Sequence, residues 1–373
     1  MKIFVYGTLQ SHALRAAVAG GAPVHAVSAT LADYAVMPVA GNVVPLIRAQ
    51  AGTVTQGEVL SDITPDQMAR LDAYEGAFGY DLIDVTVTTD AGAVDAKMYL
   101  PPDDLQAGQG AWSLDHWMHH FETMAVCAAT ELFSHDPALT PAQIVAQWPM
   151  IEKRGWAKAA ALEGHAPAKL RYMPKDGDVQ ILTSGAPSGG FFKLQAVEVQ
   201  HRQFDGKNSA ALQREVFMGV DAVMVLPYDP KRDRVLLVEQ IRMGPALRRD
   251  ANPWTLEPIA GMVDATETPE QSARRESIEE AGLTDIDLVH LTSYYPSPGA
   301  SADYFYSYLG LCELPDGHAQ FGGLDSEAED LRLHVISFDQ AMDLMASQEI
   351  NAGPLIMMLS QLSMQRNALR KGA

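Results

Sequence analysis

The stretch "GMVDATETPEQSARRESIEEAGL", residues 261–283, places three glutamates within five residues of a chain whose formal net charge is already −20. On a helix of 3.6 residues per turn, Glu276, Glu279 and Glu280 fall within an arc of about 100°. Like charges at this spacing repel one another, and burial makes the repulsion worse. One reading is a solvated acidic helix face. The other is a site for a hard divalent cation with oxygen ligands, Mg²⁺ or Mn²⁺.

Helix-terminating signals bracket the cluster. Thr268 is a candidate N-cap, and Pro269 stands at the first helical position. Gln271 can complete a capping box with Thr268, and Gly282 is a C-terminal stop. We therefore expect a helix here. Ile278, Ala281 and the stem of Arg274 lie opposite the acidic side and are expected to face the core.

The composition is that of a globular protein with ample core. The 373 residues suggest two or three domains, with 47% hydrophobic and 20% charged residues. The excess of Asp+Glu (47) over Lys+Arg (27) argues against nucleic acid and anionic membrane as partners. No apolar run is long enough to span a bilayer, and the N-terminus lacks a secretory h-region. Cys127 and Cys312 form no disulfide or metal-ligand pattern, so a cytoplasmic location is expected.

The pattern along the chain predicts an α+β protein. Turn residues and alternating apolar residues indicate strands in the first hundred residues, a hairpin over 221–242 and a mixed sheet in the second half. Helices are expected over 64–76, 112–135 and 140–164, and the final helix over 338–348. The Met-rich stretch 355–365 is expected to be core. We divide the chain into 1–110, a helical extension and linker over 111–185, and 186–373.

The spacing in the opening stretch resembles the Nudix signature. Gly261 is followed after five residues by Glu267, and after seven more by Arg275 and Glu276. Glu279-Glu280 and Gly282-Leu283 complete the pattern G-x5-E-x7-R-E-U-x-E-E-x-G-U, with Ser277 where a bulky aliphatic residue is usual. The resemblance implies a C-terminal α/β/α sandwich with a mixed sheet.

Further segments over about 190–370 resemble the ADP-ribose diphosphatase branch of this family. They are "VLLVEQIR", "PWTLEPIAGMVD", "SPGASADYFY" and "DSEAEDLRLHV". The resemblance implies Mg²⁺-dependent hydrolysis of ADP-ribose to AMP and ribose 5-phosphate by a homodimer. The branch includes relatives acting on GDP-mannose and proteins associated with tellurite resistance, so another nucleoside diphosphate sugar stays an alternative. A non-catalytic ADP-ribose sensor is a second alternative, although it would need no metal cage.

Site residues follow from the acid cluster and from the resemblance. Glu276, Glu279 and Glu280 are expected to hold the metal, and the resemblance adds the backbone carbonyl of Ala260. Metal ions neutralise a diphosphate and lower the pKa of a bound water, so Glu280 is also counted as catalytic. Arg275 is expected to orient a carboxylate, and Glu267 to be structural.

The general base and the substrate contacts are expected outside the helix. The acidic loop "LDSEAEDLR" supplies Glu327 as first choice of base and Glu329 as second, with a solvated loop as the alternative. By resemblance, Arg242 and Arg214 contact the substrate, although Arg214 is equally read as a surface ion pair. "GGFFKLQAVEVQHRQF" would be a strand exchanged in the dimer. Its Phe191 or Phe192 would stack on the adenine or lie in the core.

The N-terminus carries a second motif. In "VYGTLQ" a strand runs into a glycine turn whose backbone N–H groups at Gly7, Thr8 and Leu9 form a nest for a carboxylate. With Glu75 in "LDAYEGAFGY", this resembles the gamma-glutamylcyclotransferase-like fold, a small β-barrel with helices, over about 1–110. The resemblance implies that Tyr6 lines the pocket and that Glu75 moves the proton. No arginine follows Tyr80 as in many members, so a domain kept for binding or dimerisation stays an alternative.

A histidine cluster follows this domain. His116, His119 and His120 are spaced so that two imidazoles share a helix face. A metal site is one reading. A polar helix face beside Trp112 and Trp117 is the preferred one.

Overall fold

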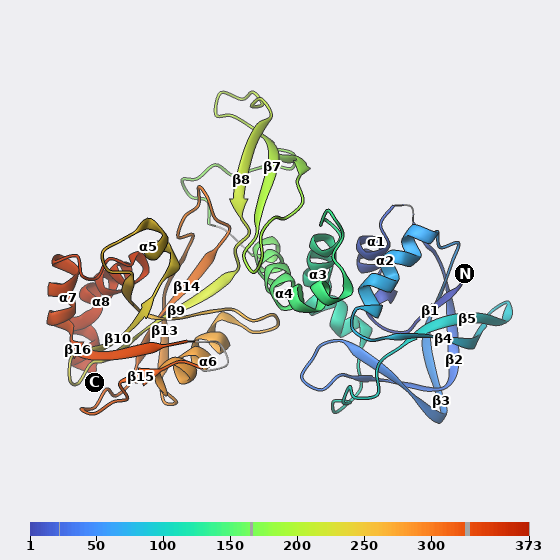
Figure 1. The fold of residues 1–373 in the computed structure, drawn as a ribbon, viewed down its shortest axis with the longest axis horizontal. Helices are drawn as coiled ribbons and strands as arrows, with labels where there is room; N and C mark the ends of the chain where they lie inside the picture. Colours follow the sequence, from blue (N-terminus) through green and yellow to red (C-terminus); the bar gives the residue numbers. More distant parts are fainter. Residues whose placement is uncertain (22, 165–166, 325–328, 373) are drawn as a thin grey trace. The chain divides into compact units, whose positions relative to one another are not determined.

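The computed structural model describes residues 1–21, 23–164, 167–324 and 329–372. They form two compact units, Met1–Glu215 and Val216–Ala373, each of which is considered by itself. Both units mix helices and strands, which confirms the predicted α+β class (Figure 1). In these ranges no helix combines the length and the apolar character needed to cross a membrane.

A closed barrel in the order β1-β3-β2-β4-β5 organises the first unit. Its strands are β1 (Ile3–Val5), β2 (His25–Pro38), β3 (Pro45–Ser61), β4 (Asp81–Thr89) and β5 (Gly92–Leu100). The sheet closes because β1 pairs antiparallel with β3 and parallel with β5. Flanking helical turns are η1 (Thr8–Gln10), α1 (His12–Ala19) and α2 (Pro65–Gly76). The predicted N-terminal barrel with helices is confirmed.

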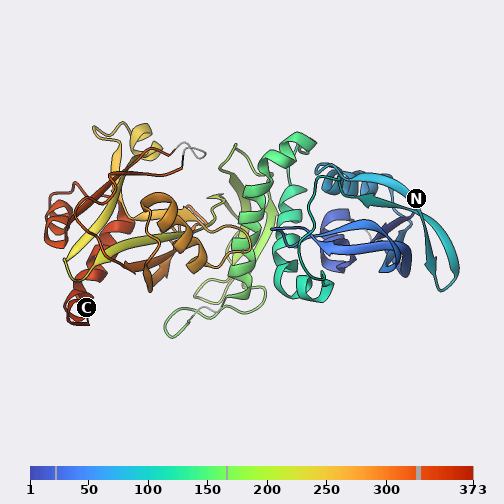
Figure 2. The same ribbon diagram turned by 90° about the horizontal axis from the view of Figure 1, so that it is seen from below.

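Two long helices extend this unit, α3 (Leu114–Leu132) and α4 (Pro141–Glu163), and they lie side by side in both ribbon views (Figures 1 and 2). Their close approach depends on Gly155, where a Cβ atom would lie 2.8 Å from the carbonyl oxygen of Met124. Next to it the buried Arg154 donates from Nε to Glu131 Oε1 at 2.8 Å. The glycine contact and the buried ion pair together hold α4 against α3.

A three-stranded sheet, β6-β7-β8, follows the helices. Its strands are β6 (Val179–Ser184), β7 (Leu194–His201) and β8 (Leu212–Phe217). Residues up to Glu215 group with the first unit, whereas the sequence placed 186–215 with the Nudix-like part. The three-part division stays a prediction about folding units. Phe191 and Phe192 are 57% and 59% exposed, so the core reading of these rings was wrong.

A mixed sheet in the order β13-β14-β9-β10-β16-β15 organises the second unit. The members of this path are β9 (Asp221–Asp229), β10 (Arg234–Ile241), β13 (Asp287–Tyr294), β14 (Tyr304–Leu311), β15 (Phe321–Gly322) and β16 (Leu331–Ser337). β9 and β14 are parallel, and β9 and β10 form the predicted hairpin. β9 and β10 pair with each other near the turn that joins them. Farther along, β12 (Ile259–Met262) pairs with β9, and β11 (Trp254–Glu257) pairs with β10.

Helices cover both faces of this sheet (Figure 1). Met224, Leu226 and Tyr228 of β9 pack with α7 (Phe338–Ala346) and α8 (Gly353–Gly372). α6 (Pro269–Ala281) contacts β9 and β12, and a short α5 (Met243–Arg248) follows β10. The expected C-terminal sandwich with a mixed sheet is confirmed. The expectation that the chain's final helix spans 338–348 was wrong, because α8 follows it. Of the Met-rich stretch, α8 buries Leu355, Met358, Leu359 and Leu362 as core, whereas Met364 is 78% exposed.

Replacing Gly155 by alanine should destabilise the first unit by about 1–3 kcal/mol, because the new methyl group meets the Met124 carbonyl and the α3–α4 crossing must widen. Thermal unfolding of the full chain, followed by circular dichroism, measures the change. Gly76→Ala is the matched control, since a Cβ there has nothing within 4 Å. Equal unfolding temperatures for the two variants would contradict the close crossing.

Candidate functional site

Helix α6 begins and ends where the sequence predicts. The Thr268 side chain accepts from the Gln271 N–H while the Gln271 side chain accepts from the Thr268 N–H, with Pro269 at the first helical position. Gly282 ends the helix in the left-handed conformation at φ 65°. The buried side of α6 is lined by small residues and one acid, Ser272, Ala273, Ser277, Glu280 and Ala281.

This arrangement corrects the predicted orientation. Ile278 is 48% exposed, so its assignment to the core side was wrong, while that of Ala281 is confirmed. Ser277, at the position where a bulky aliphatic residue is usual, is buried and donates to the carbonyl oxygen of Ala273 at 2.7 Å. Its hydroxyl is therefore satisfied inside the helix, and α6 approaches the sheet on a face of small side chains.

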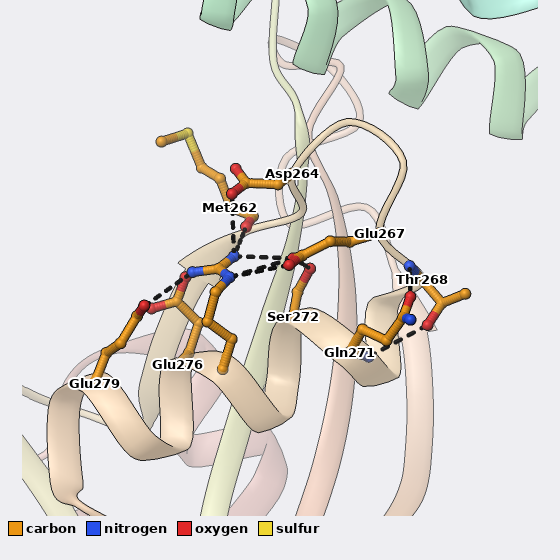
Figure 3. Close-up of polar contacts among 9 residues, drawn as sticks. Met262, Asp264, Glu267, Thr268, Gln271, Ser272, Glu276 and Glu279 are labelled. Carbon is orange, nitrogen blue, oxygen red and sulfur yellow. Dashed lines mark hydrogen bonds and ion pairs between the residues drawn. The ribbon is translucent and has the colours of Figure 1, made fainter. Parts of the chain in front are cut away.

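Arg275 joins three acids, Glu267, Glu276 and Glu279, which Figure 3 shows beside α6. Its Nη1 donates to Glu276 Oε1 at 2.6 Å and to Glu279 Oε2 at 3.0 Å. Its Nη2 donates to Glu267 Oε2 and to the carbonyl oxygen of Met262, both at 3.2 Å. The predicted pairing of Arg275 with a carboxylate is confirmed. Glu267 also accepts from Ser272 Oγ at 2.6 Å, which ties the loop before α6 to the helix.

Glu280 is different, because it is buried and only partly satisfied. Its side chain accepts from the backbone N–H of Ala260, but Oε2 has no hydrogen-bond partner. Burial, together with the charges of Glu276 and Glu329, raises the pKa of Glu280 to about 9. An unpaired buried carboxylate oxygen is costly unless a ligand satisfies it.

Glycines shape the space around these acids. A Cβ atom at Gly261 would lie 1.9 Å from Glu276 Oε1, so the carboxylate rests directly on the glycine backbone. A Cβ atom at Gly322 of β15 would lie 1.7 Å from the carbonyl oxygen of Glu280. Gly261 thus holds one acid of the cluster close to β12, the strand that also carries Ala260.

The cluster fits a divalent cation by its chemistry. Across the described ranges, no group of three or more His, Cys, Asp or Glu side chains already surrounds a common metal position. Arg275 draws Glu276 and Glu279 toward itself. Nevertheless the donor set consists of hard carboxylate oxygens, and it includes the unpartnered Oε2 of Glu280. A metal ion would satisfy that oxygen and offset both the burial and the repulsion that raise the pKa of Glu280.

Arg242 and Glu329 lie near this cluster. Arg242 donates from Nη2 to Glu257 Oε2 at 2.6 Å, and Glu257 also accepts from Thr255 Oγ1 at 2.6 Å. Burial lowers the pKa of Arg242, but the Glu257 hydrogen bonds and the charges of Glu257, Glu280 and Glu329 outweigh it and raise the pKa overall. The Glu257 partner was not predicted. The contact depends on tertiary structure, because it joins β11 to the residue that follows β10.

Two predicted residues cannot be joined to this site. Glu327 lies outside the described residues. Arg214 is exposed on β8 in the first unit and donates to the carbonyl oxygen of Gln213 at 2.7 Å. Their roles stay predictions.

The first unit contains a cavity of about 340 Å³. Its wall includes all five residues named from the N-terminal motifs, Tyr6, Gly7, Thr8, Leu9 and Glu75. Tyr6 donates from its hydroxyl to the carbonyl oxygen of Tyr99 at 3.1 Å. Burial raises the pKa of Glu75 to about 7. The cavity also takes Trp148 and Glu152 from α4, which no sequence signal indicated.

His116, His119 and His120 lie on the exposed side of α3. Their rings contact one another, with centroids 4.4 Å apart for His116–His120 and 4.6 Å for His119–His120. Within the parts of the chain that the structure describes, they belong to no metal-competent group. The exposure of the three imidazoles is that of a polar helix face, the preferred interpretation.

Comparison with known families agrees with this division. Residues 218–356 match the NUDIX domain model, and residues 3–118 match the model described as gamma-glutamyl cyclotransferase, AIG2-like. The chain belongs to the Nudix family and is a Nudix hydrolase that also carries an N-terminal AIG2-like domain. Nudix hydrolases generally use divalent metal ions.

Three relatives describe the likeness further. A protein of Haemophilus influenzae named ADP-ribose pyrophosphatase is 36% identical over 197 residues, which cover 52% of this chain and 90% of the relative. A protein of Escherichia coli with the same name is 36% identical over 193 residues, covering 52% and 91%. The GDP-mannose pyrophosphatase of Escherichia coli is 27% identical over 177 residues, covering 48% and 91%.

Replacing Gly261 by alanine should weaken Mn²⁺ binding by about 10- to 100-fold, because the methyl group displaces the Glu276 carboxylate. Electron paramagnetic resonance of free Mn²⁺ in a titration measures the affinity. Gly353→Ala at the start of α8, where a Cβ has nothing within 4 Å, should bind Mn²⁺ like wild type. Unchanged affinity in Gly261→Ala would remove Glu276 from the proposed metal site.

Proposed function

We propose that the C-terminal unit hydrolyses the diphosphate of ADP-ribose to AMP and ribose 5-phosphate, with Mg²⁺ bound and Mn²⁺ as a substitute. The observation that carries the proposal is the buried, unpartnered Glu280 oxygen inside the Nudix acid cluster. The names of the relatives at 36% identity support ADP-ribose as the substrate. A GDP-mannose substrate is the alternative that the more distant relative supports.

The reaction breaks one phosphoanhydride bond. The oxygen of water forms a bond to one phosphorus, the bridging P–O bond breaks, and the bridging oxygen leaves with the other phosphate. The two hydrogens of water are shared between the products and solvent. Bound Mg²⁺ would neutralise the diphosphate and lower the pKa of the attacking water.

The chain's own residues divide the remaining tasks. Glu276, Glu279, Glu280 and the carbonyl of Ala260 would hold the metal, and Arg275 would set the Glu276 and Glu279 side chains. Arg242, oriented by Glu257, would contact phosphate or ribose oxygens. For Arg214 the same role rests on the family resemblance alone. For the general base we propose Glu327 first and Glu329 second. The charge of Glu329 reaches Glu280, which supports a role for this segment at the site.

We further infer a homodimer formed through the C-terminal part, from the family resemblance, and a cytoplasmic location, from the two unpaired cysteines Cys127 and Cys312. A non-catalytic sensor of ADP-ribose is the alternative to an enzyme of this specificity. The intact acid cluster counts against a sensor, because ligand binding alone does not require a buried metal-type carboxylate.

Replacing Glu280 by glutamine should lower the rate of AMP release from ADP-ribose by roughly 100-fold or more, because the amide removes a metal ligand and a negative charge. The fold should persist, since glutamine is isosteric and avoids a buried charge. Chromatographic detection of AMP in Mg²⁺ measures the rate. Glu270→Gln, an exposed position on the same helix, is the matched control.

Full activity in Glu280→Gln would exclude the proposed site. Hydrolysis of GDP-mannose in preference to ADP-ribose would replace the substrate and keep the mechanism. A wild-type chain that binds ADP-ribose but turns over no nucleoside diphosphate sugar would favour the sensor.

For the first unit we propose gamma-glutamylcyclotransferase chemistry. The α-amine nitrogen of a gamma-glutamyl compound attacks its own γ-carbonyl carbon, the new C–N bond closes 5-oxoproline, and the original amide C–N bond breaks. Glu75 would take the proton from the attacking amine and deliver it to the leaving amine. The nest at Gly7, Thr8 and Leu9 would hold the substrate carboxylate. The shared cavity wall supports this proposal.

The cyclotransferase rate should rise with pH and level off above about 7, because burial raises the Glu75 pKa to about 7 and the base acts only when deprotonated. The measurement is 5-oxoproline release at limiting substrate across pH 5–9. Glu75→Gln should lose about 10²- to 10⁴-fold of the rate. A profile that is flat from pH 5 to 8 would contradict Glu75 as the base.

A further inference from the structure

A second cavity, of about 540 Å³, lies in the C-terminal unit beside β16. Its wall consists of residues 315–320, which precede β15, of residues 332–337 on β16, and of Arg234 and Gln340. The volume is within the range of small-molecule sites, about 300–1,000 Å³. Among the described residues that line this cavity, none belongs to the acid cluster of α6. The cavity is therefore a separate feature of this unit.

Hydrogen bonds hold the 315–320 segment in place. His318 donates from Nε2 to the carbonyl oxygen of Ala281, where α6 ends, at 3.2 Å. The carbonyl oxygen of Gln320 accepts from the Leu333 N–H of β16 at 2.9 Å. The segment is thus tied to a helix and to a strand of the same unit, and these contacts give the cavity a fixed wall.

The opposite wall is a strand edge. β15 pairs with the first two residues of β16, and within the described ranges no strand pairs with the rest of that edge. In an antiparallel strand, the N–H groups of alternate residues point to the same side. Leu333 directs its N–H to Gln320 on this edge, so Val335 and Ser337 direct theirs to the same side. Both residues line the cavity, which therefore offers two backbone hydrogen-bond donors.

The charge balance of the cavity is opposite to that of the chain. Asp+Glu outnumber Lys+Arg by 47 to 27 overall, but the described lining has two arginines, Arg234 and Arg332, and one acid, Asp316. Arg234 donates from Nη1 to Asp316 Oδ1 at 2.5 Å. The Asp316 side chain is 92% exposed, so water screens this ion pair and an anionic ligand can compete for Arg234.

Arg332 and two imidazoles complete the basic side. Arg332 Nη1 lies 4.0 Å from Glu239 Oε2, beyond hydrogen-bond distance, and Glu239 accepts instead from His334 Nε2 at 2.8 Å. His318 and His334 also line the cavity. Guanidinium and backbone N–H groups are both donors, and oxyanions supply the matching acceptors. The lining therefore favours an anion with several acceptor oxygens.

We propose that this cavity binds a small molecule carrying a phosphate group, and that Arg234 and Arg332 hold the phosphate. A phosphate group offers three acceptor oxygens and a charge of about −1.5 to −2, which matches two guanidinium groups and two backbone donors. The site is a second phosphate site of the C-terminal unit, and it is independent of the proposed hydrolysis at the acid cluster.

Isothermal titration of the full chain with inorganic phosphate tests the inference. Excess EDTA removes divalent ions, so the acid cluster repels phosphate and does not compete for it. Wild type should bind phosphate, and Arg234→Gln and Arg332→Gln should each weaken binding by about 10- to 100-fold, the range for a hydrogen bond to a charged group. Lys231→Gln, which removes a positive charge from an exposed side chain outside the cavity lining, is the matched control.

Arg332→Gln guards against misfolding, because the Arg332 side chain is 64% exposed and its loss should leave the unfolding temperature unchanged. Absence of phosphate binding in wild type would overturn the inference, as would equal weakening in Lys231→Gln. Binding lost in Arg242→Gln but kept in Arg234→Gln and Arg332→Gln would place the phosphate at the proposed hydrolase site instead. AMP release is measured separately, so failure of the hydrolase proposal would leave this second site standing.

Discussion

Burial of the Glu280 carboxylate beside other acids is the constraint on which the C-terminal unit depends. One of its oxygens has no partner, and burial together with the neighbouring charges raises its pKa to about 9. A fold gains nothing in stability from such a group, since an unpaired buried carboxylate is costly. A bound cation, as proposed above, would satisfy this oxygen and would allow this helix face to bind phosphate.

Arg275 reduces the electrostatic repulsion among the remaining acids of the cluster. Its guanidinium joins Glu276, Glu279 and Glu267, so the helix and the preceding loop share one positive charge. Gly261 then lets Glu276 rest on the β12 backbone, close to Ala260. The glycine and arginine of the motif are therefore structural supports for its glutamates.

The sequence alone predicted those features of the fold and the site that depend on neighbouring residues in the chain. The capping box, the glycine stop and the spacing of the acids located α6 and the cluster, and the family resemblance linked Glu75 to the glycine loop, with which it lines one cavity. Tertiary packing decided the rest. Ile278 faces solvent because small residues allow α6 to approach the sheet, and Glu152 enters the cavity through a helix that carries no recognisable motif. The contact between Glu257 and Arg242 likewise depends on tertiary structure, since no sequence signal linked the two residues.

The central claim is that a divalent ion occupies the space between Glu280 and its neighbours. Anomalous diffraction from crystals of the full chain grown in Mn²⁺ locates such an ion directly. The account predicts a peak at about 2.0–2.3 Å from carboxylate oxygens that include Glu280 Oε2, with Glu276 or Glu279 turned from Arg275 toward it. A map with no peak there, and with both glutamates still paired to Arg275, would contradict the account.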